Sequence, residues 1–150
     1  MTRSFLRFGW VVSLFLLASP AVAGPYSDDL AKCLVASTTS EEKTLLVQWM
    51  FATMSLHPKV KHLTNVSPAE RTRLNRRVAV LFESLLTRSC LGEAREALKN
   101  EGVATFEASF NVLGQVAGRE LATSPDVAAG FAELNKFVDA QKVQRALAAR

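Results

Sequence analysis

Few residues of this 150-residue chain could carry out acid–base or nucleophilic chemistry. There are two histidines, His57 and His62, and no G-x-S-x-G nucleophile elbow accompanies them. A histidine base needs a neighbouring hydroxyl or thiol, and no motif here supplies one. The two could bind a metal with Glu70, but their spacing does not aim both imidazoles the same way on a helix. We therefore predict surface or capping histidines, with no metal site and no catalytic residue.

Paired carboxylates are the other candidates for acid–base chemistry, and they occur at Asp28-Asp29 and Glu41-Glu42. Both pairs fall where helices are expected to begin. Acidic side chains are favoured there by the partial positive charge of the helix N-terminus, so capping explains them. The sequence also has no phosphate-binding loop and no dinucleotide fingerprint. We therefore predict that the chain needs no cofactor and is not an enzyme.

The first 23 residues have the three parts of a secretory signal peptide. Two arginines precede a short apolar centre over residues 10–18, and Ala21-Val22-Ala23 supplies the small residues that signal peptidase needs. We predict that cleavage after Ala23 releases residues 24–150 as one domain into the periplasm. The alternative is an uncleaved membrane anchor, but the proline at position 20 interrupts the apolar run before it reaches the length of a bilayer span.

Two cysteines, Cys33 and Cys90, lie far apart in the sequence. A redox centre would place its cysteines close together, as in C-x-x-C. A metal-binding pair and two separate buried thiols are the remaining alternatives. Because the predicted destination is oxidising, we predict instead that the two form a structural disulfide.

Composition and charge limit the classes of partner. With 49% hydrophobic and 21% charged residues, the chain has the composition of a globular protein and not of a disordered one. The formal net charge is +4, and removal of the two arginines of the signal peptide leaves 16 basic against 14 acidic residues. So small an excess does not support nucleic acid as a partner.

One basic cluster nevertheless stands out, around the start of a helix expected after Ser67. Cations near a helix N-terminus oppose its dipole by about 0.3–1 kcal/mol each, so selection for stability alone would avoid them. The cluster could bind an acidic protein partner in the cell envelope or the anionic headgroups of a membrane surface, or it could be a solvated face with local ion pairs. The basic patch consists of Lys59, Lys61, Arg73, Arg76 and Arg77, with Arg71 beside them.

Helical periodicity covers nearly all of the mature chain, and its short loops predict an all-α, single-domain bundle of five to six helices. Thr39 and Glu42 form a capping box, while Ser67 and Ser124 each cap a helix that opens with proline. The expected helices, the first capped by Ser27, cover residues 27–36, 41–57, 68–91, 93–100, 103–123 and from 125 onward.

The expected helix over residues 41–57 is apolar around its whole circumference. Such a helix is typically buried on all sides, so we predict that it is the centre of the bundle. Its Trp49, Met50 and Met54 are expected to fill the core. They could instead line an apolar pocket, and this makes a carrier of a small apolar ligand or lipid the alternative function.

Two later helices carry further expectations. Gly114 and Gly118 each cost a helix about 1 kcal/mol relative to alanine, and this predicts the close approach of a neighbouring helix. In the last helix, apolar residues recur at helical spacing and predict a face that is buried in the core. This face consists of Val127, Phe131, Leu134 and Val138.

Four segments resemble small exported proteins of unknown function from Gram-negative bacteria: residues 33–39, the segment from Trp49 to Pro58, Cys90, and residues 110–117. The resemblance implies a periplasmic location and carries no activity, ligand or catalytic residue. Taken with the absence of a catalytic motif, the sequence predicts a non-catalytic protein-binding module. An inhibitor, an immunity-type protein or a chaperone-like protein would fit, acting through the basic patch or the last helix.

Overall fold

The computed structural model describes residues 24–148, so the predicted signal peptide, residues 1–23, lies outside the described residues. Within this range the chain forms α-helices and short helical turns and no strand, which confirms the predicted all-α class. The α-helices are α1 (Pro25–Ala36), α2 (Ser40–Met54), α3 (Pro68–Ser84), α4 (Leu91–Glu101), α5 (Ala104–Ala122), α6 (Pro125–Glu133) and α7 (Ala140–Ala148). The short turns are η1 (Lys61–Leu63), η2 (Leu85–Ser89) and η3 (Leu134–Lys136).

Capping residues set several helix boundaries. The capping box of α2 is present: the Glu42 amide donates to the Thr39 hydroxyl at 3.2 Å, and the Thr39 amide donates to the Glu42 carboxylate at 2.9 Å. Ser67 accepts from the amide of Glu70 at 3.1 Å and caps α3 as expected. The predicted cap of α1 is wrong, because that helix begins at Pro25 and Ser27 lies inside it.

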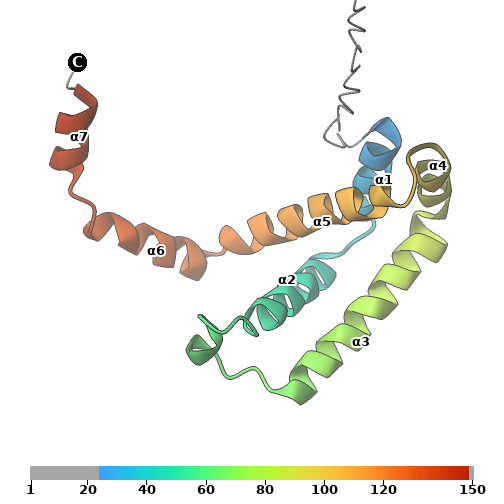
Figure 1. The fold of residues 1–150 in the computed structure, drawn as a ribbon, viewed down its shortest axis with the longest axis horizontal. Helices are drawn as coiled ribbons and strands as arrows, with labels where there is room; N and C mark the ends of the chain where they lie inside the picture. The colour runs from blue at the N-terminus through green and yellow to red at the C-terminus, as the bar shows by residue number, and fades with distance from the viewer. Residues whose placement is uncertain (1–23, 149–150) are drawn as a thin grey trace, which may run out of the picture.

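Helix α5 is the centre of the fold. It packs against both α1 and α2, while α4 covers α1 and α3 covers α2 (Figure 1). Its inner residues Leu113 and Ala117 are almost completely buried, at 0% and 1% exposed. We call the part formed by α1 to α5 the helical body.

The prediction that the second helix is buried on all sides is wrong. Helix α2 packs against α3 and α5 alone among the described elements, so a third side of it remains open. Leu45, Leu46 and Ala52 are buried, whereas Phe51 and Met54 are 53% and 64% exposed. The full apolar circumference therefore shows that α2 has more apolar surface than its two neighbours cover.

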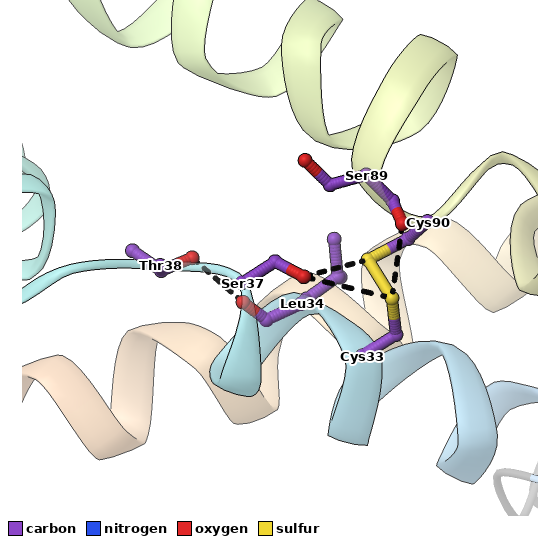
Figure 2. The surroundings of a disulfide bond; sticks show 6 residues. All are labelled: Cys33, Leu34, Ser37, Thr38, Ser89 and Cys90. Atoms are coloured by element: carbon purple, nitrogen blue, oxygen red, sulfur yellow. Dashed lines mark hydrogen bonds between the residues drawn. A yellow bond between two sulfur atoms is a disulfide. The ribbon is translucent and has the colours of Figure 1, made fainter.

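The predicted disulfide is confirmed. Cys33 of α1 and Cys90, which follows η2, have their Cα atoms 5.8 Å apart and their sulfurs bonded. The turn η2 makes this possible, since the Cys90 amide donates to the carbonyl of Leu85 at 2.8 Å and a wider helical turn carries the cysteine toward α1. The Ser37 hydroxyl contacts both sulfur atoms (Figure 2).

A polar cluster holds the other end of α1. The Glu101 carboxylate, at the end of α4, accepts hydrogen bonds from the amides of Tyr26 and Ser27 at 2.8 and 2.9 Å and from the Ser27 hydroxyl. The buried hydroxyl of Thr105 lies 2.7 Å from that of Ser27, and the Ser109 hydroxyl donates to the Ser27 carbonyl at 2.8 Å. These bonds tie α1 to both α4 and α5. The pKa of Glu101 is lowered, mainly by the hydrogen bond from the Ser27 hydroxyl.

The C-terminal arm, Pro125–Ala148, lies off the helical body and leads away from it (Figure 1). Among the described elements, α6 contacts α5 and η3, and α7 contacts no other helix. The predicted core face in this segment is therefore wrong: Phe131 is 69% exposed, Leu134 67% and Val138 47%, and Val127 is half-buried. Apolar periodicity identified an amphipathic helix correctly, but it could not show whether another element covers that helix.

The disulfide should provide much of the stability of the helical body. In the loop-closure model, removing the cross-link in the double variant Cys33→Ala/Cys90→Ala lowers the free energy of unfolding by about 4 kcal/mol. Chemical denaturation followed by circular dichroism measures the loss. Reduction of the wild-type chain should produce a similar loss, and a loss below about 1 kcal/mol in both experiments would contradict the expected contribution.

The Glu101 cluster should make stability depend on pH. Because the pKa of Glu101 is lower in the folded chain, its contribution is present above the ordinary glutamate pKa of about 4.3 and is lost as the pH falls through the folded-state value. Glu101→Gln should therefore lower the melting temperature at neutral pH, and the difference from wild type should shrink in acid. The matched control is Glu93→Gln, at an exposed glutamate at the start of α4. Equal behaviour of the two variants would contradict the assignment.

Candidate functional site

An open apolar groove with a volume of about 480 Å³ lies between α2, α3 and α5. We call it the groove. Apolar residues of all three helices line it, and its polar lining comes from α5 alone. The apolar lining is Leu46, Trp49, Met50, Phe82, Phe110 and Leu113, with Gly114 beside them, and the polar lining is Glu107, Asn111 and Gln115.

Three aromatic rings give the groove its shape. Trp49 meets Phe82 edge to face, with ring centroids 6.2 Å apart, and Phe82 lies 4.3 Å from Phe110 in a tilted arrangement. The indole N–H of Trp49 donates to Asn75 Oδ1 at 2.9 Å, so the ring is also held from the side of α3. Fixed aromatic rings are pre-organised for contact with an apolar partner, because little side-chain freedom is lost on binding.

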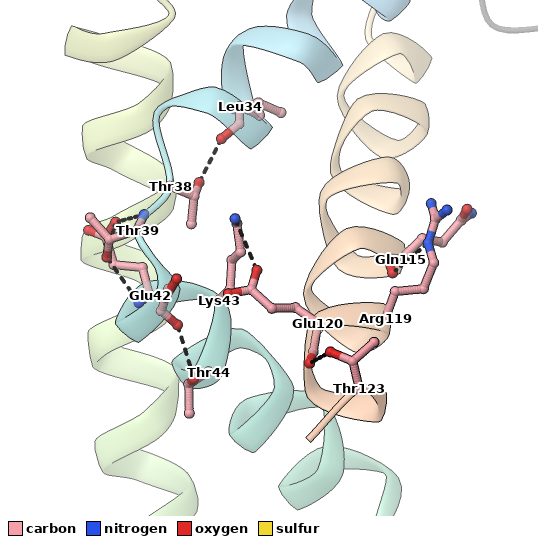
Figure 3. Close-up of polar contacts among 11 residues, drawn as sticks. Leu34, Thr38, Thr39, Glu42, Lys43, Thr44, Gln115, Arg119, Glu120 and Thr123 are labelled. Atoms are coloured by element: carbon pink, nitrogen blue, oxygen red, sulfur yellow. Dashed lines mark hydrogen bonds and ion pairs between the residues drawn. The ribbon is translucent and has the colours of Figure 1, made fainter. Parts of the chain in front are cut away.

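An ion pair connects the two helices on either side of the groove. Lys43 of α2 lies 3.1 Å from the Glu120 carboxylate of α5 (Figure 3). Hydrogen bonds from Ser40 and from Lys43 lower the pKa of Glu120, so the carboxylate is charged at neutral pH. The ion pair thus fixes α2 against the C-terminal half of α5.

The predicted pocket residues are only partly brought together. Trp49 and Met50 line the groove, whereas Met54 is one turn further along α2 and points into solvent at 64% exposed. Sequence reasoning missed Phe82 and Phe110, because no motif or spacing distinguishes them from core residues of their helices. Their helical positions were correct, but periodicity cannot show that α3 and α5 diverge enough to leave those rings half-buried at a surface.

The groove has little capacity for catalysis. Glu107 is its one ionisable lining residue, and it is exposed. Acid–base and nucleophilic mechanisms need at least two converging groups. The groove can therefore bind an apolar surface but lacks the side chains that would activate a bond in it.

The two histidines lie away from the groove, on the exposed segment between α2 and α3. His57 accepts a hydrogen bond from the Lys59 amide at 3.2 Å, and Glu70, the acid considered as a third ligand, is bound to Arg73. Across residues 24–148, no three His, Cys, Asp or Glu side chains are grouped to hold a metal ion.

Part of the basic patch has a local explanation. The guanidinium of Arg73 donates two hydrogen bonds to Glu70, at 3.0 and 2.6 Å, and these are the main cause that lowers the pKa of Glu70. Arg71 donates to the carbonyl of Val66 at 2.5 Å. Both arginines thereby stabilise the start of α3. The exposed cations that remain available to a partner are Lys59, Lys61, Arg76 and Arg77.

The glycines of α5 are not explained by contacts within the chain. A Cβ at Gly114 would meet the Met50 sulfur at 3.7 Å, an ordinary contact, and a Cβ at Gly118 would meet nothing within 4 Å. The prediction that a neighbouring helix approaches both glycines closely is therefore wrong for the described residues. The face of α5 that carries them is in ordinary contact with α2 at Gly114 and is open at Gly118.

None of the helices described between residues 24 and 148 has both the length and the apolar character needed to cross a membrane. Comparison with protein-family models, curated proteins and solved structures gave no match.

The open position of Gly118 leads to a stability prediction. Gly118→Ala should raise the free energy of unfolding by roughly 0.5–1 kcal/mol, because alanine favours the helix and meets no obstacle. Gly102→Ala is the contrasting control and should destabilise, since Gly102 has φ of +78°. Urea unfolding of both variants tests this. A destabilising Gly118→Ala would contradict the open face.

Proposed function

We propose that this chain is a non-catalytic protein-binding module of the periplasm and that the C-terminal arm is its binding element. The observation that carries the proposal is the exposure of large apolar side chains along the arm. Phe131 is 69% exposed, Phe137 84% and Leu147 81%. Several large apolar side chains exposed along one segment indicate an interaction site, because leaving them in water is unfavourable.

The shape of the arm also supports binding. Helix α6 contacts the helical body through α5 alone, and α7 contacts no described helix, so a partner can reach more than one side of each. Both helices are short, and helices of this length are marginal in water without packing against another surface. A partner would therefore stabilise the arm at the same time as it covers its apolar face.

The proposed periplasmic location follows from two observations. The N-terminal 23 residues have the composition of a secretory signal peptide. The Cys33–Cys90 disulfide connects two helices of the body, and such bonds persist in oxidising compartments and are rare in the cytosol. The predicted signal peptide and the disulfide therefore both support a periplasmic location.

Site-specific photo-crosslinking in intact cells tests the arm as the binding element. A photoreactive phenylalanine analogue in place of Phe131 or Phe137 should give covalent adducts with a protein, because both side chains would be covered in the complex. Val80 of α3 is the matched control, since it is apolar and 66% exposed but lies on the helical body.

The same experiment compares the arm with the basic patch. A third probe at Arg76 reports on that patch. Adducts from position 76 and none from positions 131 and 137 would transfer the binding role to the basic patch. Arm positions that give no more adduct than position 80 would refute the proposed function.

A carrier of a small apolar ligand or lipid is the second candidate function, and the groove favours it. Its volume of about 480 Å³ lies within the 300–1,000 Å³ typical of ligand sites, and its lining is aromatic and aliphatic. Trp49 is the one tryptophan of residues 24–150, so its fluorescence reports directly on the groove.

Fatty acid is a suitable probe for this second candidate. On a carrier, its addition should shift the Trp49 emission to shorter wavelength and add the mass of one ligand in native mass spectrometry. Gly114→Leu, which would fill the groove beside Met50, should abolish both effects. Unchanged emission and an unliganded mass would exclude the carrier.

A further inference from the structure

The chain contains both an uncovered apolar segment and an uncovered apolar groove. We propose that the groove receives the C-terminal arm of a second copy of this chain, so that the protein forms a dimer by reciprocal exchange of arms. The inference rests on the proposed function, in which the arm is the binding element, and it names the partner of that element.

The chemistry of the two surfaces is complementary. The groove presents aromatic and aliphatic side chains, including Trp49 and Phe110. The arm presents phenylalanines at positions 131 and 137, on either side of the exposed Leu134. Aromatic side chains of this kind are the residues that most often dominate the binding energy of an interface.

The arm as a whole is neutral, but its charges are not evenly distributed, and those of α7 favour the same pairing. Glu107 is the single charged residue in the lining of the groove. Helix α7 has two cations, Lys142 and Arg145, and no acid between Ala140 and Ala148. An arm whose phenylalanines occupy the groove can therefore bring a basic helix to its acidic edge.

The junction between α5 and α6 indicates why the occupant is a second copy. Two residues, Thr123 and Ser124, separate these helices, and both are bonded to α5. The Thr123 and Ser124 amides donate to the carbonyls of Arg119 and Leu121, at 3.2 and 3.0 Å. The Thr123 hydroxyl donates to the backbone carbonyl of Glu120 at 2.7 Å (Figure 3). These bonds direct the arm away from its own groove, so it can enter another chain's groove without breaking them.

The open face of α5 provides room for an incoming helix. Gly114 lies in the lining of the groove, and Gly118 follows one turn later with no atom near its Cβ position. Glycine weakens a helix, and close approach of a second helix compensates for that loss. Gly114 is the glycine that the incoming arm would contact, because it lies in the lining of the groove, whereas Gly118 lies outside that lining.

The exposed apolar residues of the arm supply part of the area that a specific dimer needs. Each phenylalanine buries roughly 150 Å² or more on entering a pocket, and a dimer would bury four of them, which gives roughly 600 Å². The rest of the roughly 1,200 Å² of a stable interface would come from the lining of the two grooves and from other exposed apolar residues of the arm, such as Leu134 and Leu147.

Sedimentation velocity on the chain beginning at Gly24 tests the dimer, with one variant for each side of the contact. Phe131→Asp/Phe137→Asp alters the arm at exposed positions that the helical body does not need. Gly114→Leu fills the groove, where the nearest atom to the new Cβ is the Met50 sulfur at 3.7 Å. Each variant should raise the dimer dissociation constant by roughly 30-fold or more, as expected for the loss of a hot spot.

Mixing the two variants gives the decisive result. The intact arm of Gly114→Leu fits the intact groove of the arm variant, so a heterodimer should form although each variant alone is a monomer. The Trp49 emission of the arm variant should shift when Gly114→Leu is added. Val80→Asp, at an exposed position outside the groove, is the control and should leave the dimer intact.

Several outcomes would overturn the proposal. A wild-type chain that stays monomeric up to millimolar concentration excludes the dimer, as does a dimer that both variants retain. If the wild-type chain is a monomer and the arm variant differs from it in Trp49 emission, the arm occupies the groove of its own chain. Failure of the dimer and failure of the proposed function give different results. A monomer whose arm crosslinks to another protein excludes the dimer and supports the protein-binding function. An arm that crosslinks to no protein excludes both the dimer and the protein-binding function.

Discussion

The anchoring of α1 between α4 and α5 is the constraint on which the rest of the structure depends. One end is held by the carboxylate of Glu101, which accepts two backbone amides of α1 and the hydroxyl of Ser27. The other end is held by the disulfide to Cys90. Leu30, between these points, and Leu34, next to Cys33, are completely buried. Because α4 and α5 both pack against α1, fixing this helix fixes the frame to which α2, α3 and the arm attach.

That frame leaves apolar surface uncovered in two places. Helix α2 meets α3 and α5 but no third helix, and the rings of Trp49, Phe82 and Phe110 remain half-buried beside it. The arm contacts the body where α6 meets α5, and it packs against no other helix of the body among the described residues. Exposure of either apolar surface to water is unfavourable, so covering it lowers the free energy of the protein. A protein partner, a second copy and an apolar ligand are alternative ways to cover them, and the last two would compete for the groove.

The basic patch has a smaller role in this description than the sequence alone would give it. A cation at a helix N-terminus is costly only when nothing compensates for it. At the start of α3, Arg73 is paired with Glu70, and Arg71 is bonded to a backbone carbonyl. The apparent cost that drew attention to the patch is therefore partly compensated within the chain, and the uncovered apolar surfaces are the stronger sign of binding.

The sequence by itself determined the class of the fold and most helix positions, because capping residues and apolar periodicity act locally. It also determined the pairing of Cys33 with Cys90, because two cysteines leave few alternatives. It expected Trp49, Met50 and Met54 to fill the core, with an apolar pocket as the alternative, and the structure places Trp49 and Met50 in the lining of the groove but not Met54. Tertiary structure alone decided which apolar faces are covered. The faces of α2 and of the arm have the same pattern as buried ones, yet Phe51 and Phe137 are exposed. Periodicity records which side of a helix is apolar, whereas burial depends on neighbours that are distant in the chain.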